Sequence, residues 1–317
     1  MAELIQSILT LTFGALLVSF CASIAIKKTL ALSYHLRISE FAISFILIGV
    51  LAVFPEMLIG VLSALENTSS FGAGVVIGSN IADLTLIIGL VALATNGMKL
   101  STNTINGFKR IVLLSSLPLI FFLDGELSKI EGLALVLCFA FYLFFILKKH
   151  TISVEKPDNF YKKDDLLKDA AILLLMIIIM VISSHFIIES AKSINVLLGI
   201  PVFFIGVILA VVTCFPEFTV ALKANKHRHG EIGFGDIIGN VFADSLLTLG
   251  VIAMISPIVP AKPYSTLLAL FIMLFAMTTL LVLARSEKEI SKDEGAFLVG
   301  IYFLLIIIQY FLGVETH

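Results

Sequence analysis

The sequence of 317 residues is 59% hydrophobic and only 14% charged, with a formal net charge of −2 at pH 7. This composition is too apolar for a soluble globular protein and places most of the chain in lipid. No basic surface dominates, which excludes a nucleic-acid-binding protein, and three cysteines without metal-ligand spacing predict buried thiols rather than a disulfide framework or a zinc site: Cys21, Cys138 and Cys214.

Ten apolar stretches, most of about the 20 residues that cross a bilayer and the fourth one shorter, predict ten transmembrane helices. In chain order they cover residues 5–26, 40–65, 72–96, 110–123, 130–147, 167–187, 200–222, 233–257, 264–284 and 295–313. The first follows an acidic N-terminus and precedes Lys27 and Lys28, which is the reverse of the charge order of a cleaved signal peptide. We therefore expect it to remain as a span.

The basic residues predict how these helices are oriented. Of the 21 Lys and Arg, all but Lys129, Lys192 and Lys262 fall in connections on one side of the predicted bundle. The positive-inside rule assigns that side to the cytoplasm. We expect a multi-pass cell-membrane protein with both termini outside and with residues 148–166 as a cytoplasmic linker.

An internal repeat relates the two halves of the chain. A shift of 161 residues without a gap places FPE at 54–56 on FPE at 215–217, and GSNIAD at 78–83 on GNVFAD at 239–244. Five predicted spans separate equivalent points, and because this number is odd the two copies cross the membrane in opposite senses. The sequence thus predicts an all-α integral membrane protein of ten helices in two inverted five-helix repeats, residues 1–147 and 167–317.

Each repeat carries two acidic residues inside apolar sequence: Glu56 and Asp83 in the first, Glu217 and Asp244 in the second. At about 1.5 Å per residue, Glu56 and Asp83 lie about 15 Å from the turn between their helices, which is the midplane of a core about 30 Å thick. One carboxylate there costs about 3 kcal/mol, so four would cost about 12 kcal/mol, comparable to the stability of a whole domain. No Lys or Arg lies within these spans, so protons or metal cations must neutralise the acids.

The surrounding residues favour hard cations. Pro55 and Pro216 lack an N–H and would leave the carbonyls of Leu51 and Val212 free in mid-helix. Three further oxygen-bearing side chains lie one turn from the acids: Ser79, Asn240 and Thr213. This all-oxygen set suits calcium, magnesium or sodium, whereas zinc and copper prefer imidazole or thiolate.

The duplicated Pro-Glu helix followed by a Gly-Ser-Asn helix resembles the alpha repeats of the cation/calcium exchanger superfamily. The resemblance covers essentially the whole membrane chain and implies an inverted pair of repeats. It implies that Glu56 and Glu217 coordinate calcium and that the first and sixth helices slide against a fixed core to give alternating access. The further contributors that it implies are Asp83, Asp244, Ser79, Asn240 and Thr213.

The coupling ion stays open. Where sodium-coupled members of that superfamily carry a Gly-Thr-Ser-type run before Pro-Glu, this chain has Ala52 and Val53, then Thr213 and Cys214. The missing hydroxyls and the second aspartate give weight to protons as counter-ion, or to magnesium as transported ion. We expect a secondary-active antiporter, not an enzyme, that exchanges calcium for sodium or protons; the alternative is a magnesium or other divalent cation/proton exchanger.

Two other classes have weaker support. GFGD at Gly233–Asp236 matches the glycine-flanked aspartate signature of intramembrane aspartyl proteases. However, the repeat partner of Asp236 is the apolar Val75. Asp236 is also expected at the start of its helix, where the helix dipole stabilises an acidic side chain. A passive channel would differ from an exchanger because its calcium flux needs no counter-ion. The expected partners are the bilayer and metal cations, with no cofactor, no nucleic acid and no obligate protein partner.

Overall fold

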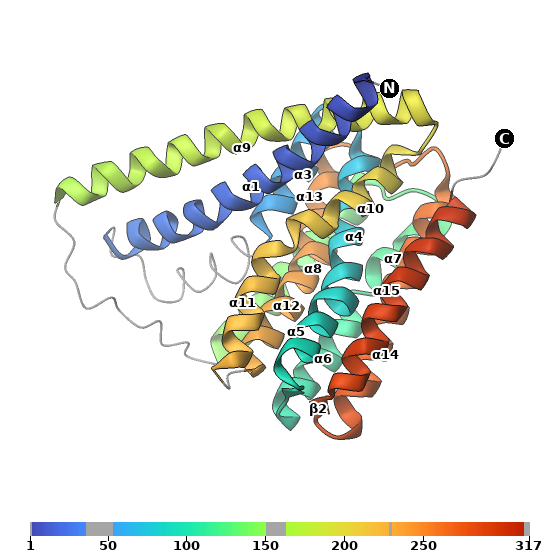
Figure 1. Cartoon of the computed structure of the whole chain (residues 1–317). Coiled ribbons are helices and arrows are strands. Elements are labelled where there is room, and N and C mark those ends of the chain that lie inside the picture. Colours follow the sequence, from blue (N-terminus) through green and yellow to red (C-terminus); the bar gives the residue numbers. More distant parts are fainter. Residues whose placement is uncertain (1, 36–52, 150–162, 228–229, 314–317) are drawn as a thin grey trace.

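The computed structural model describes residues 2–35, 53–149, 163–227 and 230–313 (Figure 1). Within these ranges, nine helical segments are long and apolar enough to cross a membrane, and a shorter apolar helix covers Phe54–Leu65. That shorter helix is the second part of the predicted span 40–65, of which residues 40–52 lie outside the described ranges, as does most of the predicted linker 148–166. The number of spans agrees with ten.

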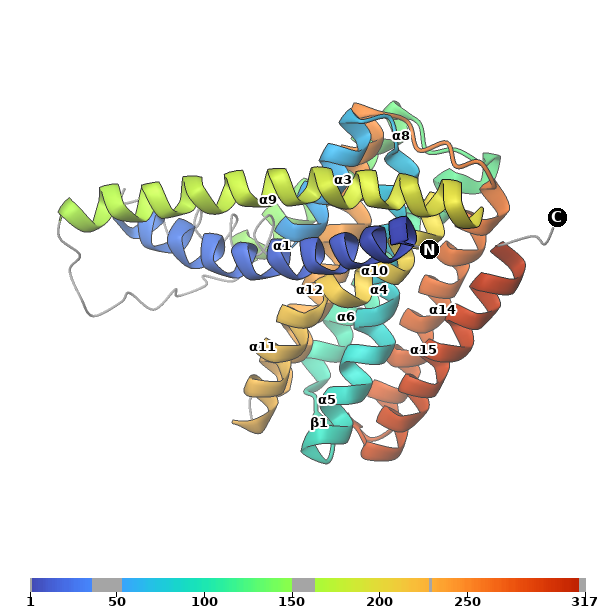
Figure 2. The same ribbon diagram turned by 45° about the horizontal axis from the view of Figure 1, so that its top comes forward.

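The first and sixth predicted spans form a long antiparallel pair. Helices α1 (Ala2–His35) and α9 (Lys163–Leu198) lie side by side and are tilted relative to the other helices, as Figure 1 and Figure 2 show. Small residues allow the close approach, since a Cβ on Gly14 would meet Ile187 Cγ1 at 2.8 Å. Both helices extend well beyond the predicted spans 5–26 and 167–187.

The remaining elements form a bundle beside this pair. In the first half they are α3 (Phe54–Leu65), α4 (Ser69–Ala82), η2 (Asp83–Ile87), α5 (Ile88–Thr95), β1 (Met98–Lys99), α6 (Thr102–Leu114), α7 (Leu117–Phe121), η3 (Phe122–Asp124) and α8 (Lys129–Lys149). In the second half they are α10 (Val202–Thr213), α11 (Phe215–Lys226), α12 (Gly230–Ala243), η4 (Asp244–Thr248), α13 (Leu249–Ile255), α14 (Pro263–Ser286), β2 (Glu289–Ile290) and α15 (Lys292–Gly313).

The fourth span starts earlier than its hydropathy predicts. Hydropathy predicts residues 110–123, but α6 begins at Thr102, and the Ser101 side chain caps it by accepting from the Thr104 amide at 3.3 Å. The first turns of α6 are polar, so they carry no hydropathy signal. Pro118 then separates this helix into α6 and the short α7.

Two pairs of contacts show how the halves interlock. A Cβ on Gly89 of α5 would lie 2.7 Å from the Gly295 carbonyl of α15, and one on Gly132 of α8 would lie 2.7 Å from the Gly250 carbonyl of α13. The loops of the two halves also contact each other: β1 pairs with β2 at one end, and an isolated β-bridge joins Leu127 to Ile258. Each half therefore packs its last helix onto the other half, and the predicted fold of two inverted five-helix repeats is confirmed.

Helices α4 and α10 cross at the centre of the bundle through glycines. A Cβ on Gly78 would lie 2.6 Å from the Val207 Cα, and one on Gly206 would lie 2.5 Å from the Phe71 carbonyl. A Cβ on Gly74 would collide with the Phe203 carbonyl. Small residues at such crossings let helix backbones approach closely, and here they hold together the helices that carry Ser79 and Thr213 of the candidate site.

A charged cluster ties α9 to the turn after α3. The Glu66 carboxylate accepts from His185 Nδ1 at 2.9 Å and from Lys192 Nζ at 3.0 Å, and Lys192 also donates to Glu189 at 2.8 Å. Partial burial raises the pKa of Glu66, but the hydrogen bonds from His185 and Lys192 outweigh it and hold that pKa below its usual range. The contacts explain why α9 continues through polar residues that end the predicted span.

We predict that Glu66→Gln loosens this attachment. The folded-state pKa of Glu66 is lowered, so its contribution to stability is present above the unfolded pKa of about 4.3 and is lost as the pH falls below it. Because the cluster is partly exposed, the effect is small, about 0.5–1 kcal/mol. Thermal unfolding in detergent should show a slightly lower midpoint at pH 7 and a shrinking difference as the pH falls below about 4.3, whereas Glu287→Gln, at an exposed position, should match the parent protein throughout.

Candidate functional site

The two glutamates lie where helices restart. Helix α10 ends at Thr213, and α11 begins at Phe215 with Pro216 in its first turn and Glu217 directly after it. Pro216 has no N–H, so the continuous helix loses one hydrogen bond at this point. Glu56 occupies the equivalent first turn of α3, where the free amides and the dipole of a helix N-terminus favour an acidic side chain.

The two aspartates lie at a second kind of helix irregularity. Asp83 begins the π-helical segment η2 between α4 and α5, and Asp244 begins the equivalent segment η4 between α12 and α13. π-Helical turns are rare and occur frequently at functional sites. Hydropathy and motif spacing do not reveal them, because the flanking residues are those of an ordinary apolar helix.

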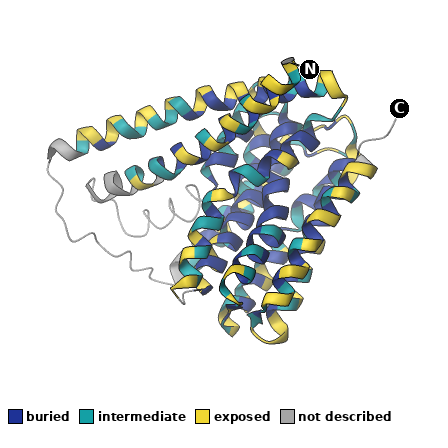
Figure 3. Ribbon diagram, viewed as in Figure 1, coloured by how far each residue is buried: buried dark blue, intermediate teal, exposed yellow. Residues whose placement is uncertain are grey.

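All four acids are inside the protein. The exposed fraction is 0% for Glu56, Asp83 and Asp244 and 8% for Glu217. Figure 3 shows that the buried residues concentrate along the central helices of the bundle. The acids are thus buried within the fold, and their depth in the bilayer stays a prediction.

Two of the hydrogen bonds that cross between the repeats end on the aspartates. Ser79 Oγ donates to Asp244 Oδ2 at 3.0 Å, and Asn240 Nδ2 donates to Asp83 Oδ2 at 3.3 Å. Ser79 and Asn240 are equivalent in the repeat, and so are the two aspartates, so each repeat supplies a donor to the acid of the other. The sequence had predicted these side chains near the acids, and the fold pairs them across the two halves.

Several buried oxygens at this centre lack a hydrogen-bond donor. Among the described residues these are both carboxylate oxygens of Glu56, Oδ1 of Asp83, Oδ1 of Asp244, Oε2 of Glu217, and Oδ1 of Asn80 and Asn240. A buried oxygen without a partner costs about 1–3 kcal/mol, and more when it is charged. Apart from the Thr248 hydroxyl, the unpartnered atoms around the acids are acceptor oxygens, and such oxygens are the ligands that hard cations prefer.

The acids approach one another without surrounding a single point. The charge of Glu56 acts on Asp83, Asp244 and Glu217. Within the described ranges, however, no group of three or more His, Cys, Asp or Glu side chains is arranged to hold one metal ion. The structure therefore places the four predicted acids close enough for their charges to interact, and one ion could bind all of them only if the helices that carry them moved.

Ser79 Oγ also lies 2.9 Å from the Val76 carbonyl oxygen of its own helix, and a bond of the same kind is made by Thr213. Its hydroxyl donates to the Ala210 carbonyl of its own helix at 3.0 Å, and so only its lone pairs face other groups. The expected free carbonyl of Leu51 lies outside the described residues. Val53 and Cys214, which take the places of hydroxyl residues, are both completely buried.

Two buried polar residues beside the acids were not predicted. Asn80 donates through Nδ2 to Ser245 Oγ at 3.1 Å and to Met273 Sδ at 3.5 Å. Asn80 directly follows Ser79 in the sequence, and Ser245 directly follows Asp244. At both equivalent positions of the other repeat the residue is apolar. Comparison of the two repeats hides such positions, but a polar side chain in a helix buried on all sides could have indicated them.

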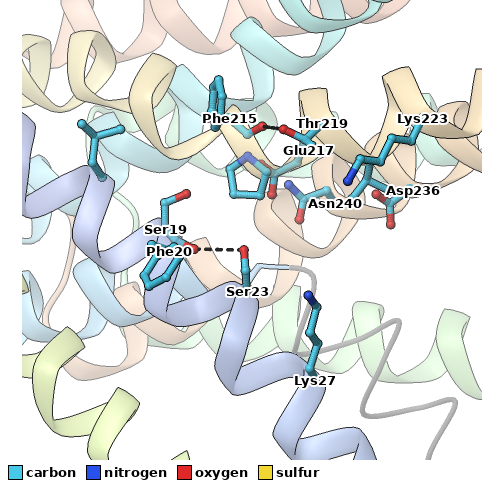
Figure 4. Close-up of a pocket in the computed structure, with 13 residues that line it drawn as sticks. Ser19, Phe20, Ser23, Lys27, Phe215, Glu217, Thr219, Lys223, Asp236 and Asn240 are labelled. Atoms are coloured by element: carbon cyan, nitrogen blue, oxygen red, sulfur yellow. Dashed lines mark hydrogen bonds between the residues drawn. The ribbon is translucent and has the colours of Figure 1, made fainter.

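A cavity of about 690 Å³ reaches the candidate site (Figure 4). It lies between α1, α11 and α12 and reaches from Lys27 and Lys223 to Glu217 and Asn240. We call the end of the bundle that carries Lys27 and Lys223 the lysine end. On the opposite side of the site, α9 packs directly on α3, with Met180 and Ile187 in one apolar cluster with Ile59.

The sequence matches a described family over both halves of the chain. The family described as "Sodium/calcium exchanger protein" covers residues 6–148 and 168–311. The chain is 25% identical over 330 aligned positions to the sodium/calcium exchanger MaX1 of Methanosarcina acetivorans, covering 90% of this chain and 93% of that protein. It is 23% identical to the inner membrane protein YrbG of Escherichia coli strain K12, covering 96% of each.

The fold is also similar to a solved structure. The sodium-calcium exchanger NCX_Mj, soaked with Na⁺ and Sr²⁺, superposes with a TM-score of 0.63 and 21% identity, covering 96% of this chain and 99% of that one. At this identity the comparison concerns the fold alone. It supports the arrangement of helices described above.

Proposed function

The chain belongs to the sodium/calcium exchanger protein family, and from this premise we propose that it moves calcium against sodium or protons through the buried site formed by the two repeats. Membership in the family makes it a multi-pass membrane transporter of the cation-exchanger class and not an enzyme. The identity of the ions and the roles of individual residues are the proposal.

The observation that carries this proposal is the set of buried oxygen acceptors without donors. Glu56 contributes two of these oxygens and Glu217 one, and the other acids and amides supply the rest. A divalent cation would satisfy several of them at once and neutralise charge that is expensive to bury. We assign Glu56 and Glu217 as central ligands. The supporting ligands are Asp83, Asp244, Ser79, Asn240 and Thr213.

Obligatory exchange follows from the charge of the site. An empty site with up to four carboxylates is costly to move through a low-dielectric barrier, whereas a site loaded with a cation or with protons is less so. Reorientation is therefore favoured only when an ion is bound. The tilted pair α1 and α9, which lines the cavity on one side and closes the other, is the element that we assign to alternating access.

The hydroxyl groups near the glutamates bear on whether the counter-ion is sodium or a proton. Val53 and Cys214 offer no hydroxyl next to the glutamates, which leaves Thr213, whose lone pairs stay available, as the hydroxyl residue of these positions. Sodium sites built on hydroxyls are correspondingly short of ligands, and this favours protons. Magnesium as the transported ion remains the second candidate, because the oxygen set suits both divalent ions.

Purified protein in vesicles tests the proposal. Radioactive calcium uptake should follow an outward gradient of sodium or of protons, and it should be absent when neither gradient is imposed. Excess unlabelled magnesium outside should leave calcium uptake largely unchanged; strong inhibition would favour the magnesium exchanger instead. Uptake of equal rate without any gradient would contradict exchange and indicate a channel.

A further inference from the structure

We propose that Asp236 is a further cation-binding carboxylate, which holds the transported ion in the cavity at the lysine end before the ion reaches Glu217. This inference rests on the proposed function and adds an entry site for the same ion. The entry site acts on one side of the membrane only, because it lies on the route from the lysine end. Asp236 is not among the residues assigned above as ligands.

The geometry places Asp236 on the route to the site. It lies four residues before Asn240 on α12, so the two side chains are on the same face of the helix, and both line the cavity together with Glu217 (Figure 4). Glu217 is 8% exposed, and its Oε2 has no donor among the described residues. An ion at Asp236 is therefore separated from a buried, unpartnered carboxylate only by the space of the cavity.

Helix α1 supplies further oxygens to the same cavity. Ser19 and Ser23 line it opposite α12. The Ser23 hydroxyl donates to the Ser19 carbonyl at 3.1 Å, which leaves its lone pairs able to accept or to coordinate. The cavity thus has a carboxylate on one wall and neutral oxygens on the other, as hard cations prefer.

The charges in the cavity explain why an entry carboxylate is needed. Lys27 and Lys223 line the same space and repel an incoming cation. Within the described part of the chain the ion pairs do not include Asp236, so its charge is not taken up by either lysine. Asp236 is also an exposed residue in the second turn of α12, beyond the first turn where the helix dipole would account for an acid.

The site has no counterpart in the other repeat. Val75 occupies the equivalent position, is completely buried, and lies at the α4–α10 crossing, where a Cβ on Gly206 would be 2.8 Å from its amide. The two routes to the central acids therefore differ in charge. A residue that only supported the fold would affect transport equally from both sides, whereas an entry site acts on one.

Calcium uptake into right-side-out and inside-out membrane vesicles separates the two routes. Asp236→Asn should raise the half-saturating calcium concentration about tenfold when calcium is offered at the lysine end. The same variant should leave the maximal rate, and the half-saturating concentration on the opposite side, unchanged. Asp236→Glu keeps the charge and should behave like the parent protein. Glu231→Gln, on the same helix but outside the cavity lining, is the matched control and should also behave like the parent.

An equal change on both sides, or no change on either in a protein that transports calcium, would overturn the entry site and leave the proposed function standing. Absence of coupled cation uptake in the parent protein would instead overturn the proposed function. If Asp236→Asn does not fold, Lys223→Gln provides the test in the opposite sense. Removal of that repelling charge should lower the half-saturating concentration at the lysine end alone, and an unchanged value would refute the proposal.

Discussion

Replacement of Glu56 by Gln is expected to reduce coupled calcium uptake at least 100-fold. Gln keeps the shape of the side chain but removes its charge and one of its two unpartnered oxygens. Removal of one member of a buried ionic interaction costs about 3–5 kcal/mol, which corresponds to a factor of about 100 or more in affinity. Glu217→Gln should have an effect of similar size, because Glu217 is its repeat equivalent.

Measurements of stability distinguish a ligand from a structural acid. Glu56 is completely buried without a donor among the described residues, so its neutral amide should unfold at the same or a higher temperature in metal-free buffer. Calcium should raise the unfolding temperature of the parent protein and not that of the variant. Glu126→Gln, at an exposed position, serves as the control. Unimpaired uptake by Glu56→Gln would show that this carboxyl is not a ligand.

The second large effect is expected from a single added methyl group. Gly74→Ala should prevent the close crossing of α4 and α10, because the new Cβ would collide with the backbone carbonyl of Phe203, which cannot rotate away as a side chain can. Overpacking of a core typically costs about 1–3 kcal/mol and sometimes more, and here the upper end applies. We expect a low yield of folded protein and loss of uptake.

Another glycine provides the control for that experiment. Gly300 of α15 is exposed, and a Cβ on it would meet nothing within 4 Å. Gly300→Ala should leave the unfolding temperature unchanged or slightly raised, since Ala favours helix by about 1 kcal/mol over Gly. Thermal unfolding in detergent and gel filtration compare the two variants. Equal behaviour would mean that the α4–α10 crossing can separate at little cost.

The positions of the acids were predictable because two independent signals agree. Charge inside apolar sequence is costly enough in lipid that Glu56 and Asp83 stand out individually, and their repetition at Glu217 and Asp244 makes coincidence improbable. The repeat also implies opposite orientations of the halves. These conclusions depend only on composition and order, which a sequence contains in full.

The contacts of the same residues were not predictable from spacing. Ser79 pairs with the aspartate of the other repeat, and Asn80 bonds to Ser245 and Met273, because the fold brings distant segments together. The α6 start was misplaced because hydropathy does not register a polar, capped helical turn. The protease-like aspartate at 236 was expected at a helix start, and the structure instead places it in the second turn, facing a cavity.

By itself the sequence determined the membrane class, the number of spans, the inverted repeat and the four buried acids, because the cost of burying charge and the length of a span act locally along the chain. Only the tertiary structure decided which side chains meet, where the helices change to π-helical turns and which end of the site is open. Those features depend on contacts between residues far apart in sequence, such as the glycine-lined crossing of α4 and α10, and side-chain packing settles them.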